Sequence, residues 1–335
     1  IIVENKYTVN YNNAVVSSGI DINIEDAAID IKNNKIVIYG FRNDLSGKTT
    51  WASVALDENN AYFDKNEQQS NYEYSALYAS YNPVTSSINL VATSKENQTG
   101  LILNMDSNNY SQVISTLYQQ SACEIDAIGT NFNNVIIAIY GLSGIAISTT
   151  SSITFSDDDG YAIDSPAENK INNITGLTNC IVIATDNGLY ACEYPEDSSN
   201  NLTINPVSGS FIDSKVYLYV SSNSNSNLIA FSKNNKIMYT TNAINWNESN
   251  IDLNTLGYTY NGVCNYNGYA IAIPGDNKSP FLYASRTDLS SWTNTNITTD
   301  IIVDKVLQIP RTDFVIGIDK TNNKVYGFNF ASLFK

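Results

Sequence analysis

Short apolar runs, each bounded by polar turn residues, recur along this chain. They begin at Ile36, Ile88, Val135, Ile181, Leu228, Ala270 and Phe314, and successive runs start 42 to 52 positions apart. Each run is apolar almost without interruption, as at 181–184 (IVIA), which is typical of a strand buried on both faces. A repeat of this length matches one four-stranded blade of a β-propeller. The pattern therefore predicts seven repeats, with each run as the second strand of its blade.

A further strand-like segment follows each run after a polar turn. These segments open near Trp51, Leu101, Ile145, Leu189, Ile237, Phe281 and Val325. The intervening turns contain Gly, Asn and Asp, as at 141–144 (GLSG) and 186–188 (DNG), which favour the tight turns of β-hairpins. We expect the two segments of each repeat to pair as second and third strands of one antiparallel sheet.

The two ends of the chain complement each other. The last repeat reaches its third strand at 325–330 and leaves no room for a fourth, whereas the N-terminal segment Tyr7–Tyr11 alternates as a strand would. An N-terminal strand added to the last blade would close the ring and cover an open sheet edge. The sequence thus predicts an all-β fold, a single seven-bladed β-propeller of four-stranded antiparallel blades whose last blade is closed by the N-terminal strand.

This prediction treats residues 1–335 as one domain. The closing strand lies within residues 1–20, and the blades lie at about 24–66, 74–117, 122–160, 169–209, 213–250, 256–299 and 301–331.

Charge and composition narrow the set of partners. The formal net charge is −15, so the chain lacks the basic surface that binds nucleic acid or an anionic membrane. No apolar run approaches the length of a membrane span, and we expect no membrane insertion. Because the chain begins with Ile and shows no signal peptide, we expect a processed chain or an excerpt.

The missing residue types also limit catalysis. The sequence contains no His, which excludes Ser-His-Asp and Cys-His hydrolysis and His-based metal sites. Its four Cys form no CxxC pair, so we expect them to be core residues. The acidic run at 157–160 (DDDG) lacks the alternating ligands of a calcium loop. We therefore predict no catalytic residues, no metal site and no cofactor.

Two segments resemble a known structural motif. The segment 239–246 (YTTNAINW) is similar to a degenerate Asp-box, the hairpin that repeats in sialidase-like (BNR) propellers, including those of phage, viral and microbial surface proteins. Its matching residues are Thr240, Asn242 and Trp246, with Asn242 in place of the usual Asp. The segment 283–292 (YASRTDLSSW) is similar, and its matching residues are Ser285, Asp288 and Trp292. The resemblance implies a structural hairpin between the third and fourth strands of a blade, which is also where the repeat pattern places both segments.

Sialidase activity does not follow from this resemblance. That family binds its substrate with three converging arginines, and this chain has only Arg42, Arg286 and Arg311. The repeat pattern distributes them over both faces of the ring. Glycoside hydrolysis by two carboxylates alone remains an alternative.

Tyrosine and one arginine carry the binding hypothesis. Tyr72, Tyr74, Tyr161 and Tyr258 fall in or beside connections between blades, on the face where we also expect Arg42. Tyrosine combines a broad apolar ring with a polar tip, which suits a sugar or a protein surface. These five residues are the predicted ligand-binding set.

The function predicted from the sequence is a non-enzymatic, surface-exposed recognition or adhesion module. It would bind a glycan or protein receptor, or neighbouring subunits of an assembly, and lie outside the cell, on the cell surface or on a virion. The alternatives are a carboxylate-dependent glycan-active enzyme and a structural subunit of an extracellular or virion assembly.

Overall fold

The computed structural model describes most of the chain. The described residues are 5–9, 22–42, 48–56, 61–82, 86–94, 99–110, 112–120, 125–130, 136–140, 144–148, 153–154, 171–193, 205–208, 211–220, 226–232, 236–308, 315–328 and 330–334. Within these ranges, none of the helices has the length and apolar character that a membrane span requires. The acidic run at 157–160 and the predicted ligand-binding residue Tyr161 lie outside the described residues.

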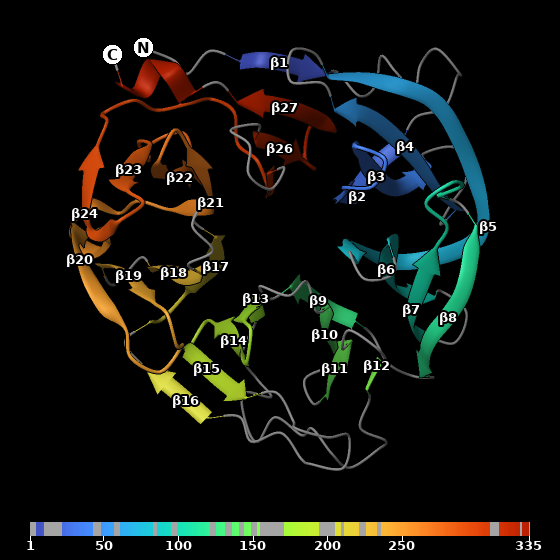
Figure 1. Cartoon of the computed structure of the whole chain (residues 1–335), viewed down its shortest axis with the longest axis horizontal. Coiled ribbons are helices and arrows are strands. Elements are labelled where there is room, and N and C mark those ends of the chain that lie inside the picture. Colours follow the sequence, from blue (N-terminus) through green and yellow to red (C-terminus); the bar gives the residue numbers. More distant parts are fainter. Residues whose placement is uncertain are drawn as a thin grey trace.

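The described strands form antiparallel sheets arranged radially around a central axis, which defines an all-β propeller (Figure 1). Five of these sheets have four strands each. The first comprises β9 (Ile125–Thr130), β10 (Ile136–Tyr140), β11 (Gly144–Ser148) and β12 (Ile153–Thr154). The second comprises β13 (Ile171–Leu177), β14 (Cys180–Thr185), β15 (Gly188–Glu193) and β16 (Asn205–Ser208).

The other three four-stranded sheets follow toward the C-terminus. One comprises β17 (Ser214–Val220), β18 (Ser226–Ser232), β19 (Lys236–Thr240) and β20 (Asn247–Asp252), and the short helix α2 (Leu253–Leu256) follows it. The next comprises β21 (Tyr260–Tyr266), β22 (Tyr269–Pro274), β23 (Leu282–Ser285) and β24 (Asp288–Asn294). The last comprises β25 (Lys305–Gln308), β26 (Val315–Asp319), β27 (Lys324–Phe328) and the N-terminal β1 (Asn5–Val9).

The remaining strands form one seven-stranded sheet. It comprises β2 (Ile22–Asp30), β3 (Lys35–Arg42), β4 (Lys48–Leu56), β5 (Ala61–Asn82), β6 (Ser87–Ser94), β7 (Thr99–Met105) and β8 (Val113–Gln120). The predicted set of seven separate four-stranded blades is therefore wrong. The structure has five such blades and one larger sheet.

The physical reason for this difference is the continuity of β5. Its 22 residues contain no Gly or Pro, so nothing in them breaks an extended backbone. Its first part pairs with β4 and its last part pairs with β6. Residues 66–74, at the boundary between the predicted blades at 24–66 and 74–117, belong to this strand instead.

The closing role of the N-terminal strand is confirmed. Strand β1 pairs antiparallel with β27, with Thr8 opposite Tyr326 and Val9 opposite Val325. Strands from the two ends of the chain thus share one sheet (Figure 1).

The core lies between adjacent sheets. As the sequence pattern predicted, every residue of β14 is buried. One cluster joins Ile229 and Phe231 of β18 to Ala272 of β22 and Trp292 of β24. Cys180 and Cys264 are buried free thiols, which confirms the expected core role for these two cysteines.

The 3-10 helix η1 (Phe330–Phe334) packs on the sheet formed by β21–β24. Phe334 stacks on Tyr269 with ring centroids 4.7 Å apart and meets Tyr283 edge-on at 4.9 Å. This contact ties the C-terminal segment to the sheet formed by β21–β24.

Candidate functional site: a polar ring on the innermost strands

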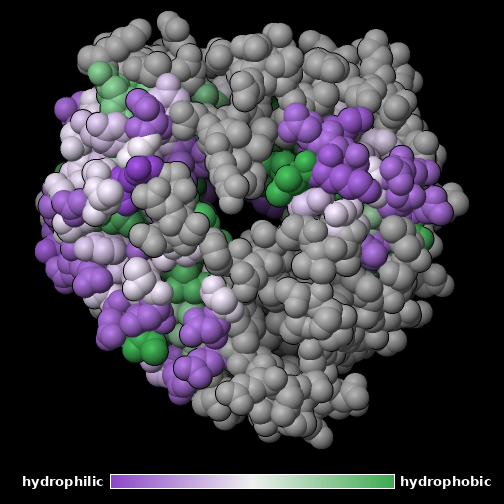
Figure 2. Space-filling model, viewed as in Figure 1, coloured by the Kyte–Doolittle hydropathy of each residue, from purple (hydrophilic) through white to green (hydrophobic). Residues whose placement is uncertain are grey.

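The innermost strand of each sheet presents one edge to the centre of the ring. Figure 1 places β2, β9, β13, β17 and β21 around that centre, and Figure 2 shows a narrow opening there. Unpaired N–H and C=O groups along such an edge need partners, because a bare edge can pair with another chain. Polar side chains of neighbouring sheets supply these partners.

A side-chain amide clamps one residue of the neighbouring sheet at three places. Asn173 of β13 accepts a hydrogen bond from Val216 N at 2.9 Å and donates one to Val216 O. Gln308 of β25 accepts from Asn265 N at 2.8 Å and donates to Asn265 O at 2.7 Å. Each amide thus satisfies the N–H and the C=O of one residue in the adjacent sheet. We call the contact between two adjacent sheets a seam.

The third amide clamp lies farther out. Asn250 of β20 accepts from Trp292 N at 2.7 Å and donates to Trp292 O at 3.0 Å. In all three cases the two residues are 42 or 43 positions apart, close to one repeat.

An ion pair clamps Ala79 in the same way. Asp26 of β2 accepts from Ala79 N at 2.8 Å, and Lys305 of β25 donates to Ala79 O at 3.3 Å. Lys305 Nζ also lies 2.9 Å from Asp26 Oδ1, and the side chains of Lys305 and Asp26 are 31% and 4% exposed. This pair lies where the last sheet meets the first, so it joins the two ends of the ring.

Further contacts connect these clamps into a polar ring, which we define as Asp26, Asn173, Lys215, Asn261 and Lys305. Lys215 of β17 donates to the side-chain oxygen of Asn261 on β21. Asn261 in turn donates to Val303 O, just before β25, at 3.0 Å. The polar ring therefore crosses every seam from β13 through β17, β21 and β25 to β2 and β5.

Four of the innermost strands, β2, β9, β13 and β21, and the crossing strand β5 share a second feature, a break in register. The breaks fall between Ile24 and Asp26, Tyr74 and Ala76, Ile125 and Ala127, Ile171 and Asn173, and Tyr260 and Gly262. Such bulges re-aim a side chain and are common at the rims of closed sheets and next to functional sites. In β2 the extra residue is Glu25.

Glu25 is a described carboxyl group whose pKa is raised. Burial raises its pKa, Lys320 lowers it and the neighbouring Asp26 raises it again. Glu25 and Asp26 therefore place two carboxyl groups together at the bulge, but Asp26 is already held by Ala79 and Lys305.

The loop after β22 is organised by a second carboxylate. Asp276 accepts hydrogen bonds from Ser279 N at 2.6 Å, Lys278 N at 3.0 Å and the Thr259 hydroxyl at 3.0 Å. Partial burial raises the pKa of Asp276, but hydrogen bonds from the Ser279 side chain and backbone, and then from Lys278 and Thr259, outweigh it and leave the pKa below its usual value. The loop at 275–279 thus has a defined shape beside the segment that carries Tyr258.

The predicted ligand-binding residues are not brought together into one described site. Arg42 ends β3, while Tyr72 and Tyr74 lie within β5, where the chain crosses from β4 to β6. Tyr161 lies outside the described residues. Tyr258 is half-buried and packs against the cluster that contains Tyr260 and Trp292.

The hairpin between β19 and β20 is held by side-chain hydrogen bonds. Thr240 Oγ1 donates to Asn245 O at 2.7 Å and accepts from Ala243 N at 3.1 Å. Asn242 Oδ1 accepts from Ile244 N at 3.0 Å and from Asn245 N at 2.8 Å.

Ala243 occupies this turn at a φ of 62°, and Trp246 Nε1 donates to its carbonyl at 3.1 Å. The hairpin between β23 and β24 repeats part of this pattern, because Trp292 Nε1 donates to Leu289 O at 2.8 Å. There Asp288 accepts from Ser290, and Ser285 contacts Thr287.

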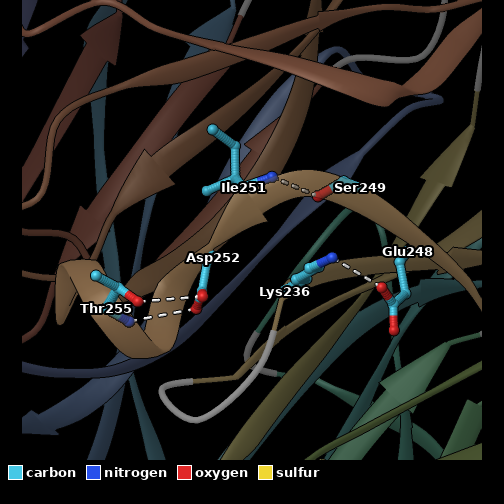
Figure 3. Close-up of polar contacts among 6 residues, drawn as sticks. All are labelled: Lys236, Glu248, Ser249, Ile251, Asp252 and Thr255. Carbon is cyan, nitrogen blue, oxygen red and sulfur yellow. Dashed lines mark hydrogen bonds and ion pairs between the residues drawn. The ribbon is translucent and has the colours of Figure 1, made fainter.

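An ion pair to β20 and a helix cap at the end of β20 add to the contacts of the β19–β20 hairpin (Figure 3). Lys236 Nζ lies 2.9 Å from Glu248 Oε2, with both side chains exposed. Asp252 caps α2 by accepting from Thr255 N at 3.2 Å and from the Thr255 hydroxyl at 3.1 Å. The Thr255 N–H, followed by its hydroxyl, lowers the pKa of Asp252. These contacts fix local structure and form no binding pocket of their own.

The polar ring was missed in the sequence. For the three amide clamps a signal is present, since Asn173, Asn250 and Gln308 each lie about one repeat from the residue that they clamp. Finding it would require the strand register, because the sequence contains many other Asn residues at similar spacings.

Comparisons with known proteins support the fold alone. No protein-family model matches the chain, and no curated protein matches it. Among solved structures, a chain in a mitotic checkpoint complex matches with a TM-score of 0.62 and 11% identity, over 98% of this chain and 95% of that chain.

Two further solved structures are also similar. Chaetomium thermophilum Sqt1 matches with a TM-score of 0.60 and 10% identity, over 98% of both chains. A Lactobacillus plantarum protein matches with a TM-score of 0.51 and 8% identity, over 83% of this chain and 85% of that chain. The chain is thus a β-propeller, and these likenesses carry no statement about its ligand.

Proposed function

We propose that this protein is a non-enzymatic recognition module that binds a glycan or protein receptor at one face of the propeller. The observation that carries the proposal is the polar ring. Its side chains hold backbone groups across the seams, so they act as structural ties rather than as free catalytic groups. A ring tied in this way is a rigid platform, and rigid platforms bind with a small loss of conformational entropy.

The exposed surface is consistent with a solvent-facing role. Among the described residues, the exposed large hydrophobic side chains are Ile31, Ile212, Val220, Ile244 and Leu256. They come from separate turns, the end of β17 and the helix α2, and the face in Figure 2 is mainly hydrophilic where it is coloured. This favours a receptor-binding module at a cell surface, outside the cell or on a virion over a structural subunit, which would need a large apolar face.

We further propose that the two Trp-containing hairpins are degenerate Asp-box hairpins. In support, Asn242 accepts two backbone N–H groups of its turn, the task that an Asp carboxylate would perform. This proposal concerns architecture and assigns no catalytic role to Thr240, Asn242, Trp246, Ser285, Asp288 or Trp292.

A glycan array that also reports hydrolysis tests the recognition proposal. We expect saturable binding with the glycans left intact. The variant Arg42→Ala combined with Tyr258→Phe should weaken it, because both residues lie on the predicted binding face. Ile244→Ser is the matched control, because it changes an exposed residue on a hairpin between third and fourth strands, which opens on the opposite face. Cleavage of any glycan would refute the non-enzymatic assignment.

A carboxylate-dependent glycan-active enzyme is the second candidate. It is favoured by the position of Glu25 beside Asp26 at the bulge of β2, where burial raises the pKa of Glu25. A carboxyl group with a raised pKa can serve as a general acid in glycoside hydrolysis. If the array shows cleavage, Glu25→Gln should abolish it, whereas Glu248→Gln on the exposed edge should not.

A further inference from the structure

Asn89 is an exception in the buried second strands. The seven apolar runs at 36–39, 88–91, 135–138, 181–184, 228–231, 270–273 and 314–317 contain one amide side chain, that of Asn89. It lies in β6 and is 1% exposed. A polar residue in a strand that is otherwise apolar on both faces needs a hydrogen-bonding partner.

The strand geometry shows which seam Asn89 faces. Its neighbours Ile88 and Leu90 belong to the cluster that contains Val37 and Tyr39 of β3. Because successive side chains of a strand point to opposite faces, Asn89 points away from that cluster. The other neighbour of this part of the sheet is β9, which contacts β5 and β6.

Two further polar residues lie beside Asn89 on the same face of the sheet, one on each neighbouring strand. Ser80 of β5 and Asn104 of β7 lie directly opposite Asn89 in the strand register. Ser80 is also buried. Three adjacent strands thus present Ser80, Asn89 and Asn104 to one seam between sheets.

Three amide atoms in this row have no hydrogen-bond partner among the described residues. Both Asn89 Nδ2 and Asn89 Oδ1 are buried without a hydrogen bond, and so is Asn104 Oδ1. This contrasts with Asn173 and Asn250, whose amides each make two hydrogen bonds across a seam. The row therefore holds one unsatisfied donor and two unsatisfied acceptors.

We propose that Asn89 and Asn104 bind an internal water molecule in the seam that faces β9. A water molecule can accept from Asn89 Nδ2 and donate to Asn89 Oδ1 and Asn104 Oδ1. These three hydrogen bonds are the number that buried water typically makes. The row of Ser80, Asn89 and Asn104 contains no charged side chain, which favours water over an ion.

A high-resolution crystal structure of the full chain tests this proposal. We expect a density peak at hydrogen-bonding distance, about 2.6–3.2 Å, from all three amide atoms. A structure in which Asn89 and Asn104 bond directly to each other, with no such peak, would overturn it.

A pair of variants adds a second test. Asn89→Leu keeps a side chain of similar size but removes two of the three polar atoms, so the density peak should disappear. Asn254→Leu, an exposed change in α2, is the control and should leave the peak in place. Persistence of the peak at full occupancy in Asn89→Leu would contradict the proposed ligands.

The test does not depend on the folding of the Leu variant. In the wild-type protein, NMR should show a cross-relaxation signal between the Asn89 side-chain NH₂ and a water of long residence time. A wild-type protein in which that NH₂ group shows no contact with bound water would also refute the site.

Discussion

Asparagine has two roles in this protein, and both follow from its short amide side chain. In turns it adopts a left-handed backbone, as at Asn34, Asn267, Asn296 and Asn323, where φ lies between 46° and 56°. In the seams its amide offers one donor and one acceptor, which match the C=O and N–H of a strand edge. The abundance of Asn in the sequence thus reflects tight turns and contacts between sheets.

Asn242 allows a test of the hairpin chemistry at a single residue. We expect Asn242→Ala to lower the free energy of unfolding by about 1–2 kcal/mol, because two backbone N–H groups lose their acceptor. Asn242→Asp should retain stability, since a carboxylate oxygen accepts the same bonds. Urea unfolding monitored by circular dichroism measures both variants, and equal losses in the two would contradict this account.

Glu25 gives the protein a predictable response to pH. Burial raises the pKa of Glu25 in the folded state, so its ionisation opposes folding. The loss of stability begins as the pH rises through the pKa of Glu25 in the unfolded state, about 4.3, and is complete above its pKa in the folded state. We therefore expect Glu25→Gln to be more stable than wild type at pH 7, measured by thermal unfolding.

The difference between Glu25→Gln and wild type should shrink as pH falls below the unfolded pKa, because both proteins are then uncharged at this position. Glu248→Gln is the control, as Glu248 is exposed. A stability difference that stays constant with pH would show that the Glu25 charge is not responsible.

At the level of elements, side-chain hydrogen bonds across the seams connect adjacent sheets. Three seams use an amide clamp, whereas the seam between the last sheet and the first uses Asp26 and Lys305 to reach the N–H and C=O of Ala79. The two charged residues together perform the task that one amide, that of Asn173, performs at Val216. The substitution Asp26→Asn can therefore offer both bonds from a single side chain.

This equivalence predicts a rescue. In the wild-type background, Lys305→Met should lower the free energy of unfolding by about 2–4 kcal/mol, because it leaves the buried Asp26 carboxylate without its cationic partner. In the Asp26→Asn background, the same change should cost much less, since the new amide clamps Ala79 without Lys305. Urea unfolding of the four proteins in a double-mutant cycle measures the coupling.

Lys236→Met is the matched control for this cycle. It removes a lysine from an exposed pair, so it should change the free energy of unfolding by no more than about 1 kcal/mol. If Lys305→Met costs the same in the wild-type and Asp26→Asn backgrounds, the ion pair does not act as a clamp.

At the level of the whole molecule, the ring is closed by residues distant in the sequence. Strand β1 completes the sheet of β25–β27, and Asn323, just before β27, accepts from Ile24 N of β2 at 2.9 Å. Solved structures at about a tenth sequence identity match the fold over nearly the whole chain. The fold thus depends on the period and burial of strands more than on particular side chains, and function must be sought in sites rather than in the fold.

The sequence alone determined the class of fold and the positions of many strands. The apolar runs at 181–184 and 228–231 became buried strands because burial of both faces demands uninterrupted apolar residues. The N-terminal strand was placed correctly because an unfinished last repeat leaves an open edge. The hairpin at 239–246 joins a third strand to a fourth, as the repeat pattern predicted.

Only the tertiary structure decided how strands join and which polar residues meet. The repeat pattern placed residues 66–74 at the boundary between two predicted blades, but sheet hydrogen bonds to β4 and β6 extend them into one strand. Asp26 and Lys305 are 279 residues apart, and Asn89 resembles many other Asn residues in the sequence. Local periodicity reports which positions are buried, whereas contacts between distant residues depend on strand register and ring closure, which no local pattern contains.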